Sequence, residues 1–359
     1  MKNMINKELL VEISVDKKYP IFIDCEPIEN LNEKILKYTN ANKILVVISE
    51  KVNRLYSKKL NLKNSIKFVL KDGENQKNFK TYIKILNFAL KNKLERKDAI
   101  VAIGGGVVGD LAGFVAATYL RGVDFIQIPT TLLACVDSSV GGKVGINTDY
   151  GKNLVGAFYQ PKVVFCNLNF LDTLDVRQFK TGLGEVIKYA FIEKSCHAVH
   201  KYNLFDFLND NVDLINSRDK EILAKIIQIS LELKTAVVTK DEKEHGLRRI
   251  LNFGHTYAHA VEKITNYKKF THGEAVAIGM VFAINLAFTE GLISLEYKNQ
   301  ALDFINQYNI VTKSPKFNIN KMTSIMKSDK KVENSKIKFI LPVSKSTVDC
   351  FEIKPSEIF

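Results

Sequence analysis

The stretch AIVAIGGGVVGD, residues 99–110, decides the fold class of this 359-residue chain. Its first five residues are apolar and largely β-branched, as is typical of a strand buried on both faces of a parallel sheet. Glycines follow at once, and a helical stretch begins behind them. Gly104, Gly106 and Gly109 match the spacing GxGxxG, which lets backbone N–H groups approach a pyrophosphate at the start of a helix.

Two interpretations of these glycines remain open. The common dinucleotide site has an acidic residue about 20 positions later, at the end of the next strand, where it binds a ribose. Asp124 lies at the start of that strand instead, and the motif is not at the first strand–helix turn of the chain. The glycines therefore favour dinucleotide binding by a non-standard loop, with a tight structural turn as the alternative.

Similar apolar runs lie on both sides of this stretch and alternate with helical segments. Because strand and helix signals alternate, the N-terminal part is expected to form an α/β domain with a doubly wound, Rossmann-like parallel sheet, each strand buried on both faces. The predicted elements are a hairpin of Leu9–Val15 and Tyr19–Ile23, strands at Lys43–Ile48, Ile66–Leu70, Ala99–Ile103 and Val123–Ile128, and a helix at Phe79–Asn92.

From about residue 176 the pattern becomes mostly helical. Thr271 and Glu274 form a capping-box pattern before an apolar helix. We therefore predict domains of residues 1–176 and 177–359, the second mostly α-helical, with the active site in the cleft between them. The predicted helices are Gln178–Glu193, Asp219–Val238, His255–Ile264 and Glu274–Thr289, followed by weak strands at Lys336–Leu341 and Ser346–Phe351.

Composition excludes several classes of protein. The chain is 46% apolar and 25% charged, the usual globular balance, so disorder is excluded for its bulk. Its longest apolar stretch, Ala275–Phe288, is interrupted by Asn285 and is short of the roughly 20 residues that a bilayer needs. The net charge is 52 − 39 = +13, but the lysines are spread along the chain. We predict neither a nucleic-acid nor a membrane partner.

The cysteines indicate the cellular compartment. Five are scattered without CxxC spacing, which suggests reduced thiols in a cytoplasm rather than disulfides or a zinc knuckle. The N-terminus also lacks the apolar core of a signal peptide. We expect a cytoplasmic protein in which each cysteine is an ordinary buried thiol.

Two polar loops are candidates for ligand binding. Asp137–Lys143 places an acid, two hydroxyls, two glycines and a lysine within seven residues, and a lysine there would reach a phosphate or carboxylate as a point charge. It is not a P-loop, because Val144 follows the lysine. The segment favours an anion site. Asp72–Lys77 follows another strand, and its spacing alone favours an ordinary turn over a loop that covers a ribose.

A metal site is predicted from the histidines. Three of the six lie within eighteen residues: His255 and His259 share a helix face, and His272 begins the next helix. The spacing HTYAH is not HExxH, which excludes a zinc peptidase. Glu185, in an apolar helical segment, is either a carboxylate ligand or half of a surface pair with Lys188. Spacing alone leaves the ligand set open.

Taken together, these segments resemble the 3-dehydroquinate synthase family. Six motifs match in order and in register between about residues 40 and 342, which makes the resemblance specific. They are GGGVVGDLAGFVAATYLRG (104–122), IPTTLLACVDSSVGGKVGIN (128–147), GKNLVGAF (151–158), GLGEVIKY (182–189), LNFGHTYAHA (251–260) and HGEAVAIGM (272–280). Ala258 stands where the family commonly has glycine.

The resemblance implies the cofactors and the residues around them. It implies NAD in the N-terminal domain and one divalent metal, zinc or cobalt, in the C-terminal domain, held by Glu185, His255 and His272. The implied NAD-binding residues are Asp72, Glu74, Lys77, Gly105, Gly106, Val107, Val108, Gly109, Asp110, Thr130, Thr131, Lys143, Lys152, Phe170, Leu171, Asp172 and Thr173.

The resemblance also implies a small anionic sugar-phosphate substrate and a homodimer. His259 would face the substrate phosphate, and Arg121 would reach the neighbouring subunit's phosphate site. Lys330 or its neighbour Lys331 would add one more cation. The other implied substrate residues are Asp137, Lys143, Lys152, Asn153, Lys188, Lys234, Arg248 and Asn252.

The implied activity is that of a phosphate-eliminating lyase in the shikimate pathway to chorismate and the aromatic amino acids. The family converts 3-deoxy-D-arabino-heptulosonate 7-phosphate to 3-dehydroquinate and phosphate. Transient oxidation by NAD, phosphate elimination, reduction, ring opening and an intramolecular aldol closure follow one another, without net redox change. The alternatives are a sister cyclase such as 2-deoxy-scyllo-inosose synthase, whose substrate lacks the carboxylate that Arg248 and Lys234 would face, and a metal-dependent polyol dehydrogenase.

Overall fold

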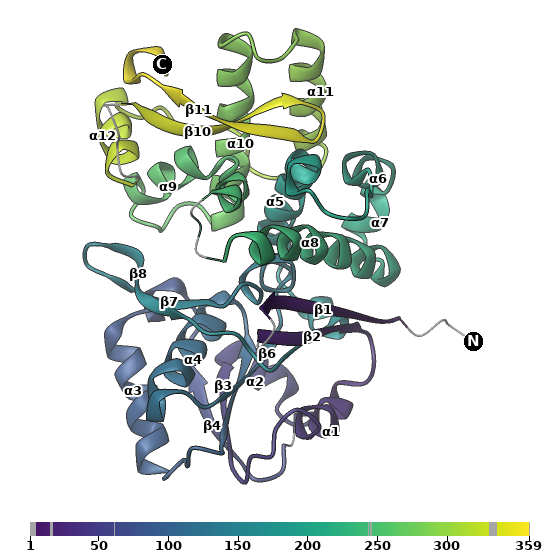
Figure 1. The fold of residues 1–359 in the computed structure, drawn as a ribbon, viewed down its shortest axis with the longest axis vertical. Coiled ribbons are helices and arrows are strands. Elements are labelled where there is room, and N and C mark those ends of the chain that lie inside the picture. The colour runs from purple at the N-terminus through teal and green to yellow at the C-terminus, as the bar shows by residue number, and fades with distance from the viewer. Residues whose placement is uncertain are drawn as a thin grey trace. The chain divides into compact units, whose positions relative to one another are not determined.

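The computed structural model describes residues 5–14, 17–60, 62–242, 244, 246–329 and 336–358, and the chain divides into two compact units (Figure 1). Unit 1 comprises Met1–Leu174 with Leu223–Leu231, and unit 2 comprises Asp175–Ile222 with Glu232–Phe359. The functional division at residue 176, between a nucleotide-binding and a metal-binding domain, stays a prediction of the sequence.

Unit 1 is built on a seven-stranded sheet with the strand order β1-β2-β9-β6-β5-β3-β4. β1 runs antiparallel to β2, and the other neighbouring pairs are parallel. The predicted Rossmann-like α/β architecture is thus confirmed. The strands are β1 (Asn6–Ser14), β2 (Lys17–Asp24), β3 (Ile44–Ser49), β4 (Ser65–Leu70), β5 (Ala99–Gly104), β6 (Asp124–Pro129) and β9 (Val163–Asn167).

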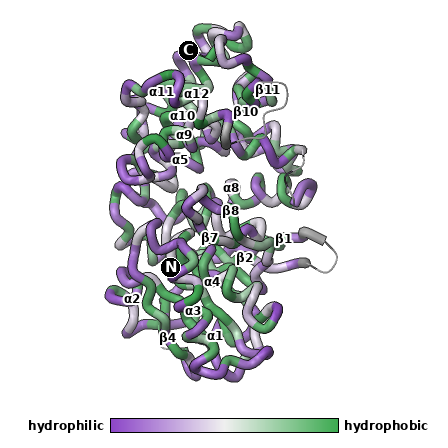
Figure 2. Tube along the Cα trace, turned by 90° about the vertical axis from the view of Figure 1, so that its left-hand side faces the viewer, coloured by the Kyte–Doolittle hydropathy of each residue, from purple (hydrophilic) through white to green (hydrophobic). Residues whose placement is uncertain are grey.

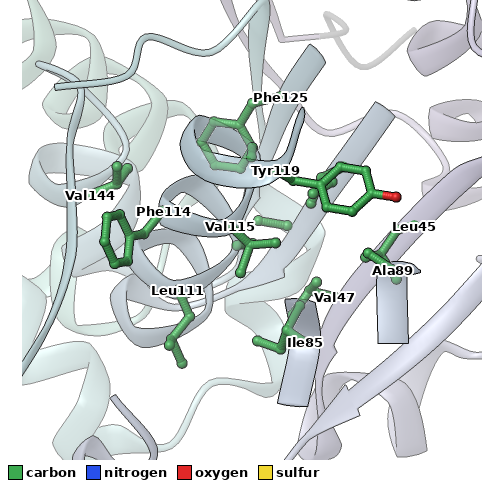
Figure 3. Close-up of a cluster of buried hydrophobic side chains, with 14 of the residues drawn as sticks. Leu45, Val47, Ile85, Ala89, Leu111, Phe114, Val115, Tyr119, Phe125 and Val144 are labelled. Atoms are coloured by element: carbon green, nitrogen blue, oxygen red, sulfur yellow. The ribbon is translucent and has the colours of Figure 1, made fainter. Parts of the chain in front are cut away.

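Helices cover both faces of this sheet because successive strand side chains point to opposite sides. Leu45 and Val47 of β3 join a core cluster with residues of α3 (Phe79–Lys91) and α4 (Gly106–Thr118), drawn in Figure 3. Val46 faces the other way, into a second cluster with α1 (Leu31–Leu36) and α2 (Glu50–Tyr56). Burial of the two clusters is the main force that holds the helices on the sheet, and it confirms the doubly wound arrangement.

Two details of the sheet differ from prediction. β4 is an edge strand whose residues are mostly half-buried, so the expectation of burial on both faces is wrong for it, since an edge strand has a neighbour on one side only. The sequence also did not predict β9, nor the separate antiparallel hairpin of β7 (Lys143–Thr148) and β8 (Gly151–Phe158). The hairpin is rich in Gly, Asn and Lys, which interrupt its apolar residues.

The chain after residue 174 is mostly helical, as predicted. Each of the four predicted helices is present, and the Thr271–Glu274 capping box is formed at the start of the apolar α10. The elements are α5 (Val176–Ile192), α6 (Leu204–Asp210), α7 (Val212–Asn216), α8 (Lys220–Lys240), α9 (His255–Ile264), α10 (His272–Thr289), α11 (Leu295–Asn306) and α12 (Ile319–Asp329), with the hairpin of β10 (Ile337–Ser344) and β11 (Thr347–Ile353).

α10 is the one described helix that is long and apolar enough, by length and composition alone, to cross a membrane. Of its 18-residue window, 67% is buried inside the protein, which is how a core helix of a globular unit behaves. Hydrophilic residues lie along the traces of both units (Figure 2), in keeping with the spread of lysines along the sequence.

The cysteines follow the expected burial only in part. Cys135, Cys166 and Cys196 are buried free thiols, and Cys25 is half-buried. Cys350 is exposed, so the expectation of burial is wrong for it. It lies on β11, in a two-stranded hairpin, next to the exposed Asp349.

Candidate metal centre and nucleotide site

Three potential metal ligands converge in unit 2. Glu185 comes from α5, and His255 and His272 are the first residues of α9 and α10. Glu185 Oε1 lies 3.4 Å from His255 Nε2 and 3.3 Å from His272 Nε2. One ligand atom from each of the three residues lies within 4.8 Å of the others. The structure therefore brings together the three residues that the resemblance implies as metal ligands.

Glycines next to the ligands explain how the helices come this close. A Cβ atom built on Gly273 would lie 2.0 Å from the Thr181 carbonyl oxygen, and one built on Gly184 would lie 2.6 Å from the Gly273 carbonyl oxygen. α5 and α10 thus cross in backbone contact beside Glu185 and His272.

α9 meets α10 in the same way. A Cβ atom built on Gly279 of α10 would lie 2.0 Å from the carbonyl oxygen of Gly254, the residue before His255. Gly254 also has a φ of +78°, which favours glycine on conformational grounds. Each ligand therefore stands next to a glycine at which two segments of backbone touch.

The donor set fits a divalent cation. Glu185 is 1% exposed, and its Oε1 accepts no hydrogen bond among the described residues. His255 Nδ1 lies 3.1 Å from the carbonyl oxygen of Phe253, so that with Nδ1 protonated the Nε2 lone pair faces that carboxylate oxygen. Two histidines and one carboxylate are the ligand types of catalytic zinc sites.

The surroundings of Glu185 exclude a surface ion pair. Lys188 Nζ lies 2.5 Å from Glu185 Oε2, but the two side chains are only 2% and 1% exposed. Burial raises the pKa of Glu185, yet the Lys188 ammonium and the neighbouring imidazoles outweigh it and hold that pKa well below its usual value. The interpretation of Glu185 and Lys188 as a solvated pair is therefore wrong, because both lie in the interior of unit 2.

The two histidines differ in charge. Burial lowers the pKa of His255, which keeps its imidazole neutral. Burial also acts to lower the pKa of His272, but the carboxylates of Glu262 and Glu185 outweigh it and raise the pKa to about 10. In the absence of a cation His272 would thus carry a proton, which a bound metal ion would displace.

Further polar residues of unit 2 are consistent with an anionic ligand. Lys188, Lys234 and Arg248 are each 5% exposed or less, although buried cations are rare in proteins. The His259 ring lies 5.5 Å from that of His255, centroid to centroid, outside the group of three ligands. Asn252 Nδ2 donates to Glu244 Oε1 at 2.8 Å.

A second polar cluster lies in unit 1 at the glycine motif. The Lys77 ammonium, 5% exposed as a residue, contacts Asp110 Oδ2 and donates to Asn153 Oδ1. Asn147 adds two links, since its backbone N–H donates to the Lys77 carbonyl at 2.9 Å and its side chain donates to Glu74 at 2.8 Å. The loop Asp72–Lys77 is thus joined to α4 and to the β7–β8 hairpin. It is more than the ordinary turn that its spacing favoured.

The glycine motif brings the start of α4 close to neighbouring side chains. β5 ends at Gly104, Gly105 caps the helix, and Gly106 is its first residue. Cβ atoms built on Gly105 and Gly106 would lie 3.1 Å from Thr131 Cγ2 and from Ser138 Oγ, respectively. The open backbone N–H groups of a helix start attract anions. The close approach of Thr131 and Ser138 is that of a tight structural turn, and the bare helix start is also compatible with a bound anion.

The remaining predicted site residues are placed as follows. Asp137 is half-buried in a π-helical turn, Ala134–Ser138, a local form that sequence patterns do not reveal and that often occurs at functional sites. Arg121 is exposed after α4 with a φ of +66°. On the β7–β8 hairpin, Lys143 is exposed and Lys152 is half-buried. Of the other residues implied for NAD, the buried ones are Thr130, Val108, Phe170 and Leu171, the half-buried ones are Val107 and Gly109, and the exposed ones are Asp72, Asp172 and Thr173. Lys330 and Lys331 lie outside the described residues.

Sequence reasoning missed Glu262. It is 3% exposed, and its Oε2 lies 3.5 Å from His272 Nδ1. The available signal was its spacing, seven residues after His255 on the same helix, which is about two turns along one face. An acidic residue on the buried face of a helix requires a partner.

The fold is similar to that of two solved synthases. A structure of 2-deoxy-scyllo-inosose synthase with carbaglucose-6-phosphate, NAD+ and Co2+ matches with a TM-score of 0.87 over 98% of both chains, at 23% identity. The 2-epi-5-epi-valiolone synthase of Streptomyces hygroscopicus subsp. jinggangensis 5008, with NAD+ and Zn2+ bound, matches with a TM-score of 0.85 at 24% identity, over 97% of this chain and 96% of that one. At 23% and 24% identity, these likenesses show the fold of the chain.

Sequence comparison identifies the family. The 3-dehydroquinate synthase N-terminal family matches residues 67–181, and the 3-dehydroquinate synthase C-terminal family matches residues 182–332. A 3-dehydroquinate synthase of Prochlorococcus marinus (strain AS9601) is 42% identical over 368 aligned positions, which cover 99% of both chains. The chain belongs to the 3-dehydroquinate synthase family. The resemblance predicted from the motifs, and the function that it implies, are confirmed.

Proposed function

We propose that this chain converts 3-deoxy-D-arabino-heptulosonate 7-phosphate to 3-dehydroquinate and phosphate, the second step of the shikimate pathway, as a lyase that depends on NAD and a divalent metal. The observation that carries the proposal is the convergence of Glu185, His255 and His272 in a chain 42% identical over its full length to a 3-dehydroquinate synthase. A cytoplasmic location fits a biosynthetic enzyme of this kind.

Glu185, His255 and His272 would hold the metal ion, Zn2+ or Co2+ as in the solved cyclases. When bound, it would supply Lewis-acid polarisation of a substrate hydroxyl. Lys188 would stay beside Glu185, 2.5 Å away, and present its ammonium to the same substrate. Because Lys188 is buried, water would screen its charge little, and its attraction to an anionic group of the substrate would be strong.

NAD would lie on unit 1, over the glycine turn and the Lys77 cluster. When bound, it would supply a hydride acceptor that is regenerated within each turnover. Gly105 and Gly106 would let the backbone N–H groups at the start of α4 approach its pyrophosphate. Lys77, positioned by Asp110 and Asn153, would keep the loop after β4 against the site. The other cofactor-binding residues implied by the family motifs remain part of this proposal.

The substrate carries a carboxylate and a phosphate, which gives the cations a role. Arg248 and Lys234 would bind the carboxylate, since a guanidinium and an ammonium buried in unit 2 offer charged hydrogen bonds. His259 would donate to the phosphate and accept or return a proton there. Asp137, Lys143, Lys152, Asn153, Lys188 and Asn252 would complete the contacts, with Lys330 or Lys331 as one more cation.

A homodimer would complete the phosphate site. Arg121 is exposed at the end of the 3-10 turn Tyr119–Arg121 that follows α4, so its guanidinium is available to a neighbouring subunit. We propose that it contacts the phosphate bound by the partner, in the symmetric manner of a two-fold dimer.

The test follows phosphate release and NADH absorbance in one cuvette. The purified chain receives the heptulosonate phosphate and catalytic NAD+, before and after treatment with a chelator. Metal-dependent phosphate release without accumulating NADH supports the proposal. NADH that accumulates stoichiometrically indicates a polyol dehydrogenase instead. Phosphate release from glucose 6-phosphate alone indicates a sister cyclase.

A further inference from the structure

Glu262 lies behind one of the three predicted metal ligands. Its Oε2 is 3.5 Å from Nδ1 of His272, on the side of the ring opposite to Nε2, which faces Glu185 at 3.3 Å. Glu262 comes from α9 and His272 from α10. The carboxylate, 3% exposed, thus joins two of the helices that carry ligands.

This contact determines which nitrogen of His272 can bind a cation. An imidazole offers a lone pair at one nitrogen only when its proton is at the other. A carboxylate beside Nδ1 keeps the proton there and leaves Nε2 for the metal ion. His255 is oriented by a different device, the backbone carbonyl of Phe253 at 3.1 Å from its Nδ1. The acceptor beside Nδ1 is therefore a side-chain carboxylate for His272 and a backbone carbonyl for His255.

Glu262 also changes the charge balance of the site. Glu185 is the one carboxylate in the ligand group, and Lys188 lies 2.5 Å from it. The negative charge of Glu185 is therefore offset before a dication arrives. Among the described contacts of the two histidines, Glu262 is a second carboxylate, and it supplies the negative charge that a buried dication needs.

We infer that Glu262 is a positioning residue of the metal centre, which sets the tautomer and orientation of His272 and raises the affinity of the site for a divalent cation. The inference rests on the metal site of the proposed function. It adds to that site a residue that binds neither the metal ion nor the substrate directly.

The test measures metal affinity rather than turnover. Full-length chain stripped of metal is titrated with Zn2+ in competition with a chromogenic chelator, and with Co2+ while its visible absorption is recorded. The variants are Glu262→Gln, of the same size without the charge, and Glu262→Asp, which keeps the charge and also serves if the amide variant does not fold. Loss of a carboxylate behind a histidine ligand typically weakens metal binding about 10- to 100-fold.

We expect Glu262→Gln to raise the Zn2+ Kd by about that factor and to change the Co2+ spectrum, and Glu262→Asp to raise it less. Glu193→Gln is the matched control, because Glu193 is also buried in unit 2 but accepts from the backbone N–H groups of Tyr202 and Leu204. The control should bind Zn2+ like the wild type.

The outcomes separate this inference from the proposed function. If Glu262→Gln binds Zn2+ as tightly as the wild type, with an unchanged Co2+ spectrum, the role of Glu262 is refuted and the metal site stands. If Glu193→Gln lost as much Zn2+ affinity as Glu262→Gln, the loss would come from general destabilisation, and the role of Glu262 would also be refuted. If the wild-type chain itself binds no Zn2+ or Co2+, the metal site fails, and the proposed function fails with it.

Discussion

At the scale of single residues, Lys77 shows how one buried charge links distant parts of unit 1. Its ammonium contacts Asp110 on α4 and Asn153 on β8, although the three residues come from separate segments of the chain. Burial of a lysine is costly unless its charge is hydrogen-bonded. Those contacts therefore hold the loop after β4 in one place.

We expect Lys77→Met to weaken NAD+ binding while the fold is retained, because the side-chain volume is kept and the charged contacts are lost. A hydrogen bond to a charged group contributes about 1.5–3 kcal/mol, which corresponds to roughly 10- to 100-fold in Kd. NAD+ titration by calorimetry measures the change, with Lys80→Met, an exposed lysine nearby, as the control. An unaltered Kd would remove Lys77 from the proposed site.

Lys34 supports a prediction on pH. Its ammonium lies 2.9 Å from Glu26 Oε2 and 2.6 Å from Asp24 Oδ2. The hydrogen bond from Lys34 holds the pKa of Glu26 below its usual value of 4.5. A carboxyl group with a lowered pKa stabilises the fold above its unfolded-state pKa, and this contribution is lost as the pH falls through the folded-state value. Melting temperatures between pH 7 and pH 3 should fall more steeply for the wild type than for Lys34→Met. Parallel curves would contradict the prediction.

At the scale of elements, glycine contacts bring the three ligands together. α5 meets α10 at Gly184 and Gly273, and α10 meets the residue before α9 at Gly279 and Gly254. Arg177 of α5 adds a bidentate pair with Glu274 of α10, at 2.7 and 2.8 Å. A helix displaced by the width of one methyl group would move its ligand out of reach of the others.

We expect Gly273→Ala to destroy metal binding as well as to destabilise unit 2. The new Cβ would lie 2.0 Å from a backbone oxygen, so the helices must separate. Overpacking of this kind costs about 1–3 kcal/mol, and more where the backbone must move. Zn2+ titration and thermal unfolding provide the measurements. Gly109→Ala is the control, since its Cβ would meet only the end of the Gln127 side chain. Wild-type metal affinity in Gly273→Ala would refute the role of the crossing.

At the scale of the whole molecule, metal binding should contribute to stability. An ion present at 100 times its Kd stabilises a folded chain by about 2.7 kcal/mol. We expect EDTA to abolish phosphate release and to lower the melting temperature on the order of 5 °C, with recovery on addition of Zn2+. The melting temperature of His255→Ala should not respond to EDTA. A similar shift in that variant would indicate an effect of the chelator elsewhere.

The proposed dimer predicts complementation between inactive variants. Arg121→Ala lacks the guanidinium lent to the partner, and His272→Ala lacks a metal ligand. In a mixed dimer one of the two sites would have both. After subunit exchange, a mixture of the two variants should therefore regain about a quarter of wild-type activity, because half of the dimers are mixed and half of their sites are complete. No recovery, with dimers present by sedimentation, would place Arg121 outside the partner's site.

Much of the fold was predictable because it follows from local patterns. The apolar runs at 44–49 and 99–104 are strands, and the helical periodicity of 220–240 is a helix, since burial selects the same periodicity in the sequence and in space. The β7–β8 hairpin escaped prediction because Gly, Asn and Lys interrupt its apolar residues; Val144–Ile146 of β7 are buried, whereas the residues of β8 are half-buried or exposed. The motifs also indicated Glu185, His255 and His272, which stand next to glycines.

The sequence by itself determined the α/β and α-helical halves of the chain, its family and the residue types of the metal group. Only the tertiary structure decided that Glu185 and Lys188 are buried rather than a surface pair, that Glu262 stands behind His272, and that Lys77 reaches across to α4 and β8. The physical reason is that periodicity reports which face of an element is buried. Which charged groups meet in that interior depends on the crossing of elements far apart in the chain.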